Sequence, residues 1–362
     1  MLRSALLPLV TSQTGNDVIV GLQQLCGVQS NSKVNLVWYS IFRAASALGE
    51  EIFSLMPALF WFGFPSVALP FATHFATLLI GQYLKDVLCL PRPDVKTTKI
   101  VRLETHFETE YGMPSTHTAS GVLPLTVFLA LKRHQPAVFA LVPAWVGPSL
   151  CLLALAVGVS RLYMGVHSVA DVTAGLGLGI TSVVVLHHYG DVFDSFVYKS
   201  HSGLYFTLVS LYWFCAHYPA TRPWSASWGT AAQIYGTWFG VALSSWAIFT
   251  YPQFHWVSAR LVKSSSRWQP RLFLLELVVA AIVSGLAKVL GKSVAQSICL
   301  QLVQRGLVKP HPAETKDVLG RPVPPTKLYC VEVPTRIFSY AFLAFSVVCL
   351  VPAAWVYLGI DP

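Results

Sequence analysis

Charged side chains are what this sequence has least of: Asp, Glu, Lys and Arg make up 11% of its 362 residues. Soluble domains carry roughly 25% charged residues. The hydrophobic fraction is 54%, so too few charged side chains remain to cover a surface that faces water. The composition excludes an ordinary soluble domain and predicts a protein that lies mostly in lipid.

Paired cysteines are also missing. None of the seven cysteines stands at a CxxC or other ligand spacing, and several lie inside apolar runs. We therefore expect buried free thiols and no zinc site. The 25 Lys and Arg exceed the 16 Asp and Glu but are scattered between apolar runs. This pattern argues against nucleic acid as a partner and suits anionic substrates or lipid surfaces.

Long apolar runs set the fold class. Nine of them approach the roughly 20 residues that cross a hydrocarbon core, at 52–64, 67–84, 114–131, 137–159, 167–186, 203–217, 231–250, 272–290 and 337–358. We expect an all-α, polytopic transmembrane bundle with four segments: an N-terminal polar and interfacial segment, a transmembrane core, a polar Pro-rich loop and a C-terminal span, at 1–48, 49–290, 291–335 and 336–362. Residues 34–47 and 252–271 are predicted to lie at the membrane interface.

Three polar clusters interrupt the apolar chain. They are Lys85, six residues, Arg92-Pro93; then Pro114-Ser115-Thr116-His117; then Ser160-Arg161, five residues, His167, three residues, Asp171. Together they hold three fixed cations, two histidines, a serine and a carboxylate. This inventory suits a phosphate ester, because the cations can cradle its oxygens while one imidazole attacks phosphorus and the other protonates the leaving oxygen.

Spacing and topology support a common site. His167 and Asp171 are four residues apart and share a helix face, so Asp171 can accept the Nδ1 proton of His167 and leave Nε2 free to attack. The first cluster ends the second expected span, the second cluster begins the third, and the third cluster joins the fourth and fifth. A path that alternates across the membrane therefore places all three clusters on one face.

In this order, the clusters resemble the signature of the type 2 phosphatidic acid phosphatase superfamily, which includes vanadium haloperoxidases and glucose-6-phosphatase. Thr116 stands where most members carry Gly. With EYGMPSTH, SRLYMGVHSVAD and the later VPTR at 333–336, the variant is similar to the sphingosine 1-phosphate phosphatases. The resemblance implies that His167 is the nucleophile, His117 the acid and base, and Asp171 the group that orients His167. It implies that the phosphate is bound by Lys85, Arg92, Ser115, Thr116 and Arg161.

The implied activity is hydrolysis of sphingosine 1-phosphate or a related sphingoid base phosphate through a phosphohistidine. The residues leave open another superfamily phosphatase, acting on glycerolipid phosphates, prenyl diphosphates or glucose 6-phosphate, and a non-catalytic scaffold or transporter for anionic lipids. Three cations beside the histidines would repel a divalent metal, so we expect no metal and no cofactor. The expected partners are the sphingoid lipid and the bilayer, and the oligomeric state stays open.

The membrane location follows from the resemblance, which implies the endoplasmic reticulum with the site facing the lumen. The distribution of Lys and Arg over the loops favours the opposite, cytosolic, placement of the site. One further acidic residue, Glu276, lies inside an expected span. Intramembrane acids are candidate functional groups, although Glu276 stands close enough to the start of that span to reach the interface.

Overall fold

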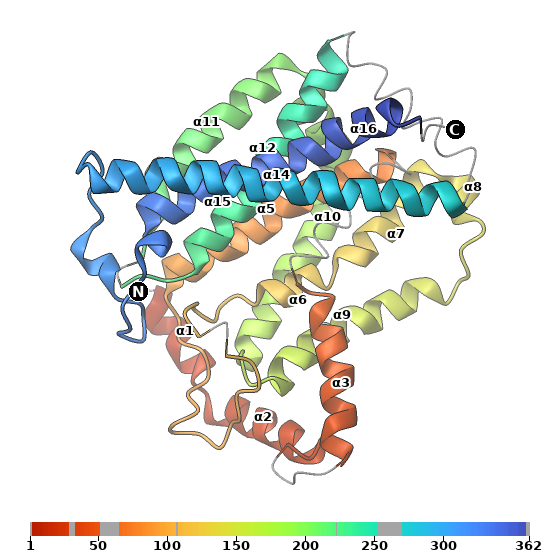
Figure 1. Cartoon of the computed structure of the whole chain (residues 1–362). Coiled ribbons are helices and arrows are strands. Elements are labelled where there is room, and N and C mark those ends of the chain that lie inside the picture. The colour runs from red at the N-terminus through yellow and green to blue at the C-terminus, as the bar shows by residue number, and fades with distance from the viewer. Residues whose placement is uncertain are drawn as a thin grey trace.

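The computed structural model describes residues 2–28, 33–50, 65–105, 108–221, 223–251 and 270–359. Within these ranges the chain is mostly helical and contains no β-strand (Figure 1). The expected all-α fold is confirmed. Four described stretches are long and apolar enough to cross a membrane: Val146–Tyr163, Val169–Lys199, Leu274–Gln304 and Tyr329–Trp355.

Most of the expected spans correspond to helices, with different boundaries. They are α5 (Pro65–Leu88), α6 (Thr116–Ser120) with α7 (Leu123–His134), α9 (Val146–Tyr163), α10 (Val169–Lys199), α11 (His201–His217), α12 (Ser227–Thr250), α14 (Pro270–Gln304), and α15 (Tyr329–Phe345), which a π-helical turn at Ser346–Leu350 joins to α16 (Val351–Tyr357). The short α8 (Pro136–Phe139) follows α7. The expected span at 52–64 and most of the interfacial segment at 252–271 lie outside the described residues.

Two expectations need correction. Residues 291–304, expected to begin the Pro-rich loop, instead continue α14 to Gln304. The physical reason is that 294–304 is built mostly from residues that tolerate a helix and contains no Pro or Gly. The cysteines are free thiols, as expected, but Cys151 and Cys215 are exposed on helix surfaces and only Cys26 and Cys349 are buried. An exposed thiol on an apolar helix is compatible with a helix that faces lipid.

The N-terminal region forms three helices, α1 (Leu2–Val10), α2 (Gln13–Leu25) and α3 (Lys33–Ala47). The last of these matches the segment expected at 34–47. Both α2 and α3 pack against α9. Gln23 fixes this corner, because its buried amide donates to the main-chain oxygens of Tyr163 at 2.8 Å and Val101 at 2.6 Å.

Two packing centres hold the helices together. On one side α12 packs against α15 and α5, and on the other α10 packs against α5, α6 and α9 (Figure 1). The short α6 fits between α5 and α10 only because glycines face it. A Cβ on Gly81 would lie 2.7 Å from Cγ2 of Thr116, and one on Gly175 would overlap the main-chain oxygen of Ser115. These close approaches bring the second polar cluster against the helices that carry the first and third.

Candidate active site

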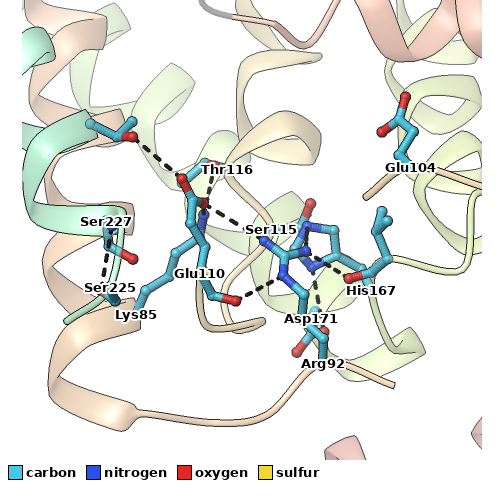
Figure 2. A network of polar contacts seen from close by, with 12 residues as sticks. Lys85, Arg92, Glu104, Glu110, Ser115, Thr116, His167, Asp171, Ser225 and Ser227 are labelled. Atoms are coloured by element: carbon cyan, nitrogen blue, oxygen red, sulfur yellow. Dashed lines mark hydrogen bonds and ion pairs between the residues drawn. The ribbon is translucent and has the colours of Figure 1, made fainter. Parts of the chain in front are cut away.

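The three polar clusters meet at the ends of four helices. Lys85 lies in the last turn of α5 and contacts Thr116 at the start of α6. Arg92, in the loop after α5, contacts His167 just before α10. The Ser115 amide donates to the main-chain oxygen of Asp171 at 3.0 Å. The three clusters that topology predicted to lie together are therefore in contact (Figure 2).

His167 and Asp171 are held by the start of α10. Nδ1 of His167 lies 3.4 Å from Oδ2 of Asp171, and both side chains are buried. The same Oδ2 accepts the Ser168 amide at 2.8 Å, while Oγ of Ser168 accepts the Asp171 amide at 3.2 Å. This is a capping box, which satisfies two otherwise unpaired amides at a helix start. Building α10 thus also fixes the carboxylate beside the imidazole.

The contact with Arg92 determines the tautomer of His167. Nη1 of Arg92 lies 3.1 Å from Nε2 of His167 and donates to the main-chain oxygen of Val166 at 2.7 Å. A guanidinium can only donate, so Nε2 must be the accepting, unprotonated nitrogen. The ring proton then resides on Nδ1, facing Asp171. Nε2 keeps the lone pair that a nucleophile needs.

The charge state of His167 agrees with this tautomer. His167 is 1% exposed and lies between α9 and α10, two helices that are long and apolar enough to cross a membrane. Burial lowers the pKa of its imidazole well below the ordinary value, and nearby Arg92, Arg161, Lys85 and His117 lower it further. The ring is therefore neutral at pH 7, which is the form that can attack an electrophile.

Lys85 and Arg92 converge on Glu110, a residue that the sequence did not single out. Nζ of Lys85 donates to Oε2 of Glu110 at 2.9 Å, and Nη2 of Arg92 lies 3.7 Å from the same oxygen (Figure 2). Nε of Arg92 donates to the main-chain oxygen of Glu110 at 2.9 Å. The three side chains are 2%, 5% and 10% exposed, respectively. The loop also contains Glu104 and Glu108. Glu110 is the first residue of the EYGMPSTH stretch, but no role was assigned to it from the sequence.

The pKa values of the two loop residues reflect this arrangement. Burial lowers the pKa of the Arg92 guanidinium to about 10, even though Glu110 acts to raise it. Burial alone would raise the pKa of the Glu110 carboxyl, but Lys85 and Arg92 outweigh it and hold that pKa below its ordinary value. Both groups are therefore charged at pH 7.

Arg161 occupies a neighbouring position with its own carboxylate. It is fully buried in the last turn of α9, donates to Oε2 of Glu104 at 3.0 Å and contacts the Ser46 hydroxyl. Glu104, another residue that the sequence did not single out, also faces Arg43 at 3.4 Å. The charge of Arg161 still lowers the pKa of His167. The three expected cations are thus near the imidazole, but they belong to two ion-pair groups.

Part of the second cluster caps the start of α6. Oγ of Ser115 accepts the Thr118 hydroxyl at 2.9 Å and the Thr118 amide at 3.4 Å. Oγ1 of Thr116 accepts from Lys85 at 3.3 Å. His117 is half-buried and packs against Gly49. A Cβ added at Gly49 would lie 3.1 Å from the Cβ of His117. The expected phosphate contacts of Ser115 and Thr116 and the proton transfer by His117 remain predictions.

The other expectations concern metals and Glu276. Among the described residues, no three His, Cys, Asp or Glu side chains gather as a group that could ligate a metal ion. The metal-free reaction argued from the cations stays a prediction. Glu276 lies on α14, which packs against α15 and α16, and its main-chain oxygen accepts the Trp355 indole at 3.1 Å. A functional role for Glu276 stays untested.

An apolar groove of about 250 Å³ runs between α5 and α10. Its end nearest the polar clusters is formed by Ile80 and Leu178. The adjacent Gly81 faces both Thr116 and Leu178, so one helical turn separates the groove from Lys85. The other lining residues are Ala76, Thr77, Thr181, Ser182, Val185, Leu186, Tyr189, Gly190 and Phe193.

Comparison with known proteins places residues 66–195 in the PAP2 superfamily. The chain is similar to sphingosine-1-phosphate phosphatase 1 of Mus musculus, with 27% identity over 90% of this chain and 74% of the relative. It is also similar to sphingosine-1-phosphate phosphatase 2 of Mus musculus, with 28% identity over 66% and 69% of the two chains. Lipid phosphate phosphatase delta of Arabidopsis thaliana is 26% identical over 99% of this chain and 91% of its own. No solved structure matches.

Proposed function

We propose that this chain, whose residues 66–195 form a PAP2 superfamily domain, is a membrane phosphatase for sphingosine 1-phosphate and related sphingoid base phosphates. The observation that carries the proposal is a buried, neutral His167 with Nε2 unprotonated and two buried cations beside it. The names of the relatives supply the substrate class. The reaction class is phosphoric monoester hydrolysis.

The first chemical step is transfer to His167. Lys85 and Arg92 hold the phosphate oxygens, and Arg161 adds positive charge nearby. As the phosphate draws Arg92 from Nε2, that nitrogen attacks phosphorus and the bond to the lipid oxygen breaks. His117 donates a proton to the leaving oxygen, which departs as the alcohol. Asp171 stabilises the positive charge that the imidazole acquires.

The second step hydrolyses the phosphohistidine. His117, now neutral, takes a proton from water while the water oxygen attacks phosphorus. The bond between phosphorus and Nε2 breaks, the electron pair returns to His167, and inorganic phosphate leaves. Water and the lipid phosphate are the only reactants that these two steps consume.

Location and access fit a lipid substrate. The polar clusters lie at helix ends, and the apolar groove between α5 and α10 begins one turn away. A single hydrocarbon chain in this groove would leave its phosphate at the level of Lys85, so substrate could enter sideways from the bilayer. We further propose nine spans, the four segments inferred from sequence with α14 extended to Gln304, and a site facing the lumen of the endoplasmic reticulum.

The decisive experiment measures phosphate release by the purified protein in detergent with chelator present. The substrates are sphingosine 1-phosphate, dihydrosphingosine 1-phosphate, a phosphatidic acid, a prenyl diphosphate and glucose 6-phosphate. We expect the sphingoid phosphates to be hydrolysed fastest, and His167→Ala to abolish release while the protein stays folded. Faster hydrolysis of another substrate would reassign the substrate class. No hydrolysis of any substrate would favour a scaffold that binds anionic lipids.

A further inference from the structure

The carboxylate of Glu110 lies where a phosphate oxygen would be expected to bind. Oε2 is 2.9 Å from Nζ of Lys85 and 3.7 Å from Nη2 of Arg92, the two cations assigned to the phosphate. We call the space between these cations the phosphate seat. A carboxylate and a phosphate ester offer the same kind of acceptor to Lys and Arg. Glu110 and the substrate therefore compete for the same donors.

We propose that Glu110 is an internal counter-ion that occupies the phosphate seat of the resting enzyme and is displaced from Lys85 by the phosphate of the substrate. This inference rests on the proposed function. A counter-ion is needed because the seat is buried: two cations that are 2% and 5% exposed would be strongly destabilising without a negative partner. Glu110 supplies that partner whenever phosphate is absent.

The geometry lets the carboxylate leave without moving the main chain. The main-chain oxygen of Glu110 is held by Nε of Arg92 at 2.9 Å, independently of the side chain. Oε1, the oxygen that does not contact Lys85, accepts the Thr230 hydroxyl of α12 at 3.3 Å. Rotation of the side chain towards Thr230 would release Lys85 and retain one hydrogen bond. The loop that carries Arg92 would stay in place.

Displacement has a consequence for turnover. Inorganic phosphate is also an anion, and two buried cations would hold it tightly after the lipid alcohol has left. The return of Glu110 to Lys85 offsets that attraction and favours departure of the product. The resting contact thus weakens the binding of phosphate and substrate, and in exchange it keeps the seat from being blocked by product.

The test compares Glu110→Gln with Glu108→Gln in the full-length protein in detergent. The control removes the same charge from the same loop, at a side chain that is 25% exposed and pairs with Arg102 and Arg321. Two readouts are needed. One is the inhibition constant of inorganic phosphate and of vanadate in the hydrolysis assay. The other is the phosphate-dependent rise in melting temperature, which reports binding without hydrolysis.

We expect Glu110→Gln to bind phosphate and vanadate at least tenfold more tightly than the wild type, with a lower KM, and Glu108→Gln to match the wild type. If Gln at position 110 instead leaves binding unchanged or weaker, Glu110 only orients Lys85 and the inference is wrong. Glu110→Asp withdraws the carboxylate from the cations by one methylene and should also tighten the binding of phosphate and vanadate, by a smaller factor. This variant replaces Glu110→Gln in the test if Glu110→Gln does not fold. If the wild type hydrolyses no ester, yet the variants differ from it in their phosphate-dependent melting temperatures as expected, only the proposed function is refuted.

Discussion

Replacing Asp171 by Asn tests how the carboxylate positions and stabilises His167. Asn has the same shape, and its amide oxygen can take over the Oδ2 contacts with the Ser168 amide and Nδ1 of His167. The change therefore removes the negative charge and leaves the start of α10 intact. The expected result is a protein of nearly unchanged stability with much slower phosphoryl transfer.

The magnitude follows from the 3.4 Å separation of Nδ1 and Oδ2. With an effective dielectric constant of about 20, full opposite charges at this distance attract by about 5 kcal/mol. Each 1.4 kcal/mol or so in the barrier changes the rate about tenfold. Desolvation and the dipole of the Asn amide offset part of the attraction, so we expect kcat to fall by about 10²–10³-fold.

The assay is single-turnover phosphate transfer with purified protein, beside a melting curve. Ser168→Ala is the matched control, because it removes the other half of the capping box but keeps the carboxylate. It should lower stability by about 1 kcal/mol and change the rate far less. If kcat of Asp171→Asn is within about fivefold of the wild-type value, and kcat of Ser168→Ala is lowered by the same factor, Asp171 serves the helix start and not the chemistry.

Four further predictions test other parts of the site. Arg92→Lys keeps the charge but loses the planar fork, so kcat/KM should fall by a similar factor for lipid and water-soluble phosphates; a change confined to chain-length preference would contradict the assignment. His117→Ala should slow an alkyl phosphate more than nitrophenyl phosphate, a better leaving group, and equal effects with transfer rate-limiting would remove His117 from the acid role. His167 stays neutral in the folded protein, whereas in the unfolded chain it takes up a proton near pH 6.5. The free energy of unfolding should therefore fall below that pH by up to about 1.4 kcal/mol per pH unit, and melting curves of His167→Gln should show a weaker dependence of stability on pH. Thr181→Trp in the groove should reduce kcat/KM for long-chain substrates and spare nitrophenyl phosphate, and an equal loss on both would argue against a chain in the groove.

The meeting of the three polar clusters was largely predictable, because their residues lie in fixed-spacing motifs at helix ends. His167 and Asp171 could be paired from helical periodicity alone, and their contact through Nδ1 and Oδ2 agrees. Hydropathy and the parity of spans placed Lys85, Arg92 and His167 on one side of the membrane. The capping box at 168–171 could also have been found, because Ser-x-x-Asp before an apolar run is a local signal for a helix start.

Glu104 and Glu110 could not be found in this way. Their roles depend on the path of a loop between two helices, and a loop path is set by tertiary contacts that have no sequence period. Three acidic residues stand within seven positions of that loop, yet only two are buried on cations and Glu108 remains partly exposed. The length of α14 was missed for a different reason, because Gly291 resembles a helix end when its packing partner is not known. In the structure, Gly291 faces Ser339 and Phe342 of α15.

The lateral entry proposed for the groove between α5 and α10 gives substrate concentration a different meaning. A substrate that enters sideways never passes through water, so the relevant quantity is its mole fraction among the lipids and not its amount per volume of buffer. Diluting a suspension of vesicles would leave the encounter rate within each bilayer unchanged, whereas adding inert lipid at constant substrate would lower it. Such an enzyme responds to crowding of one lipid species in its own membrane, and its working range is set by membrane composition.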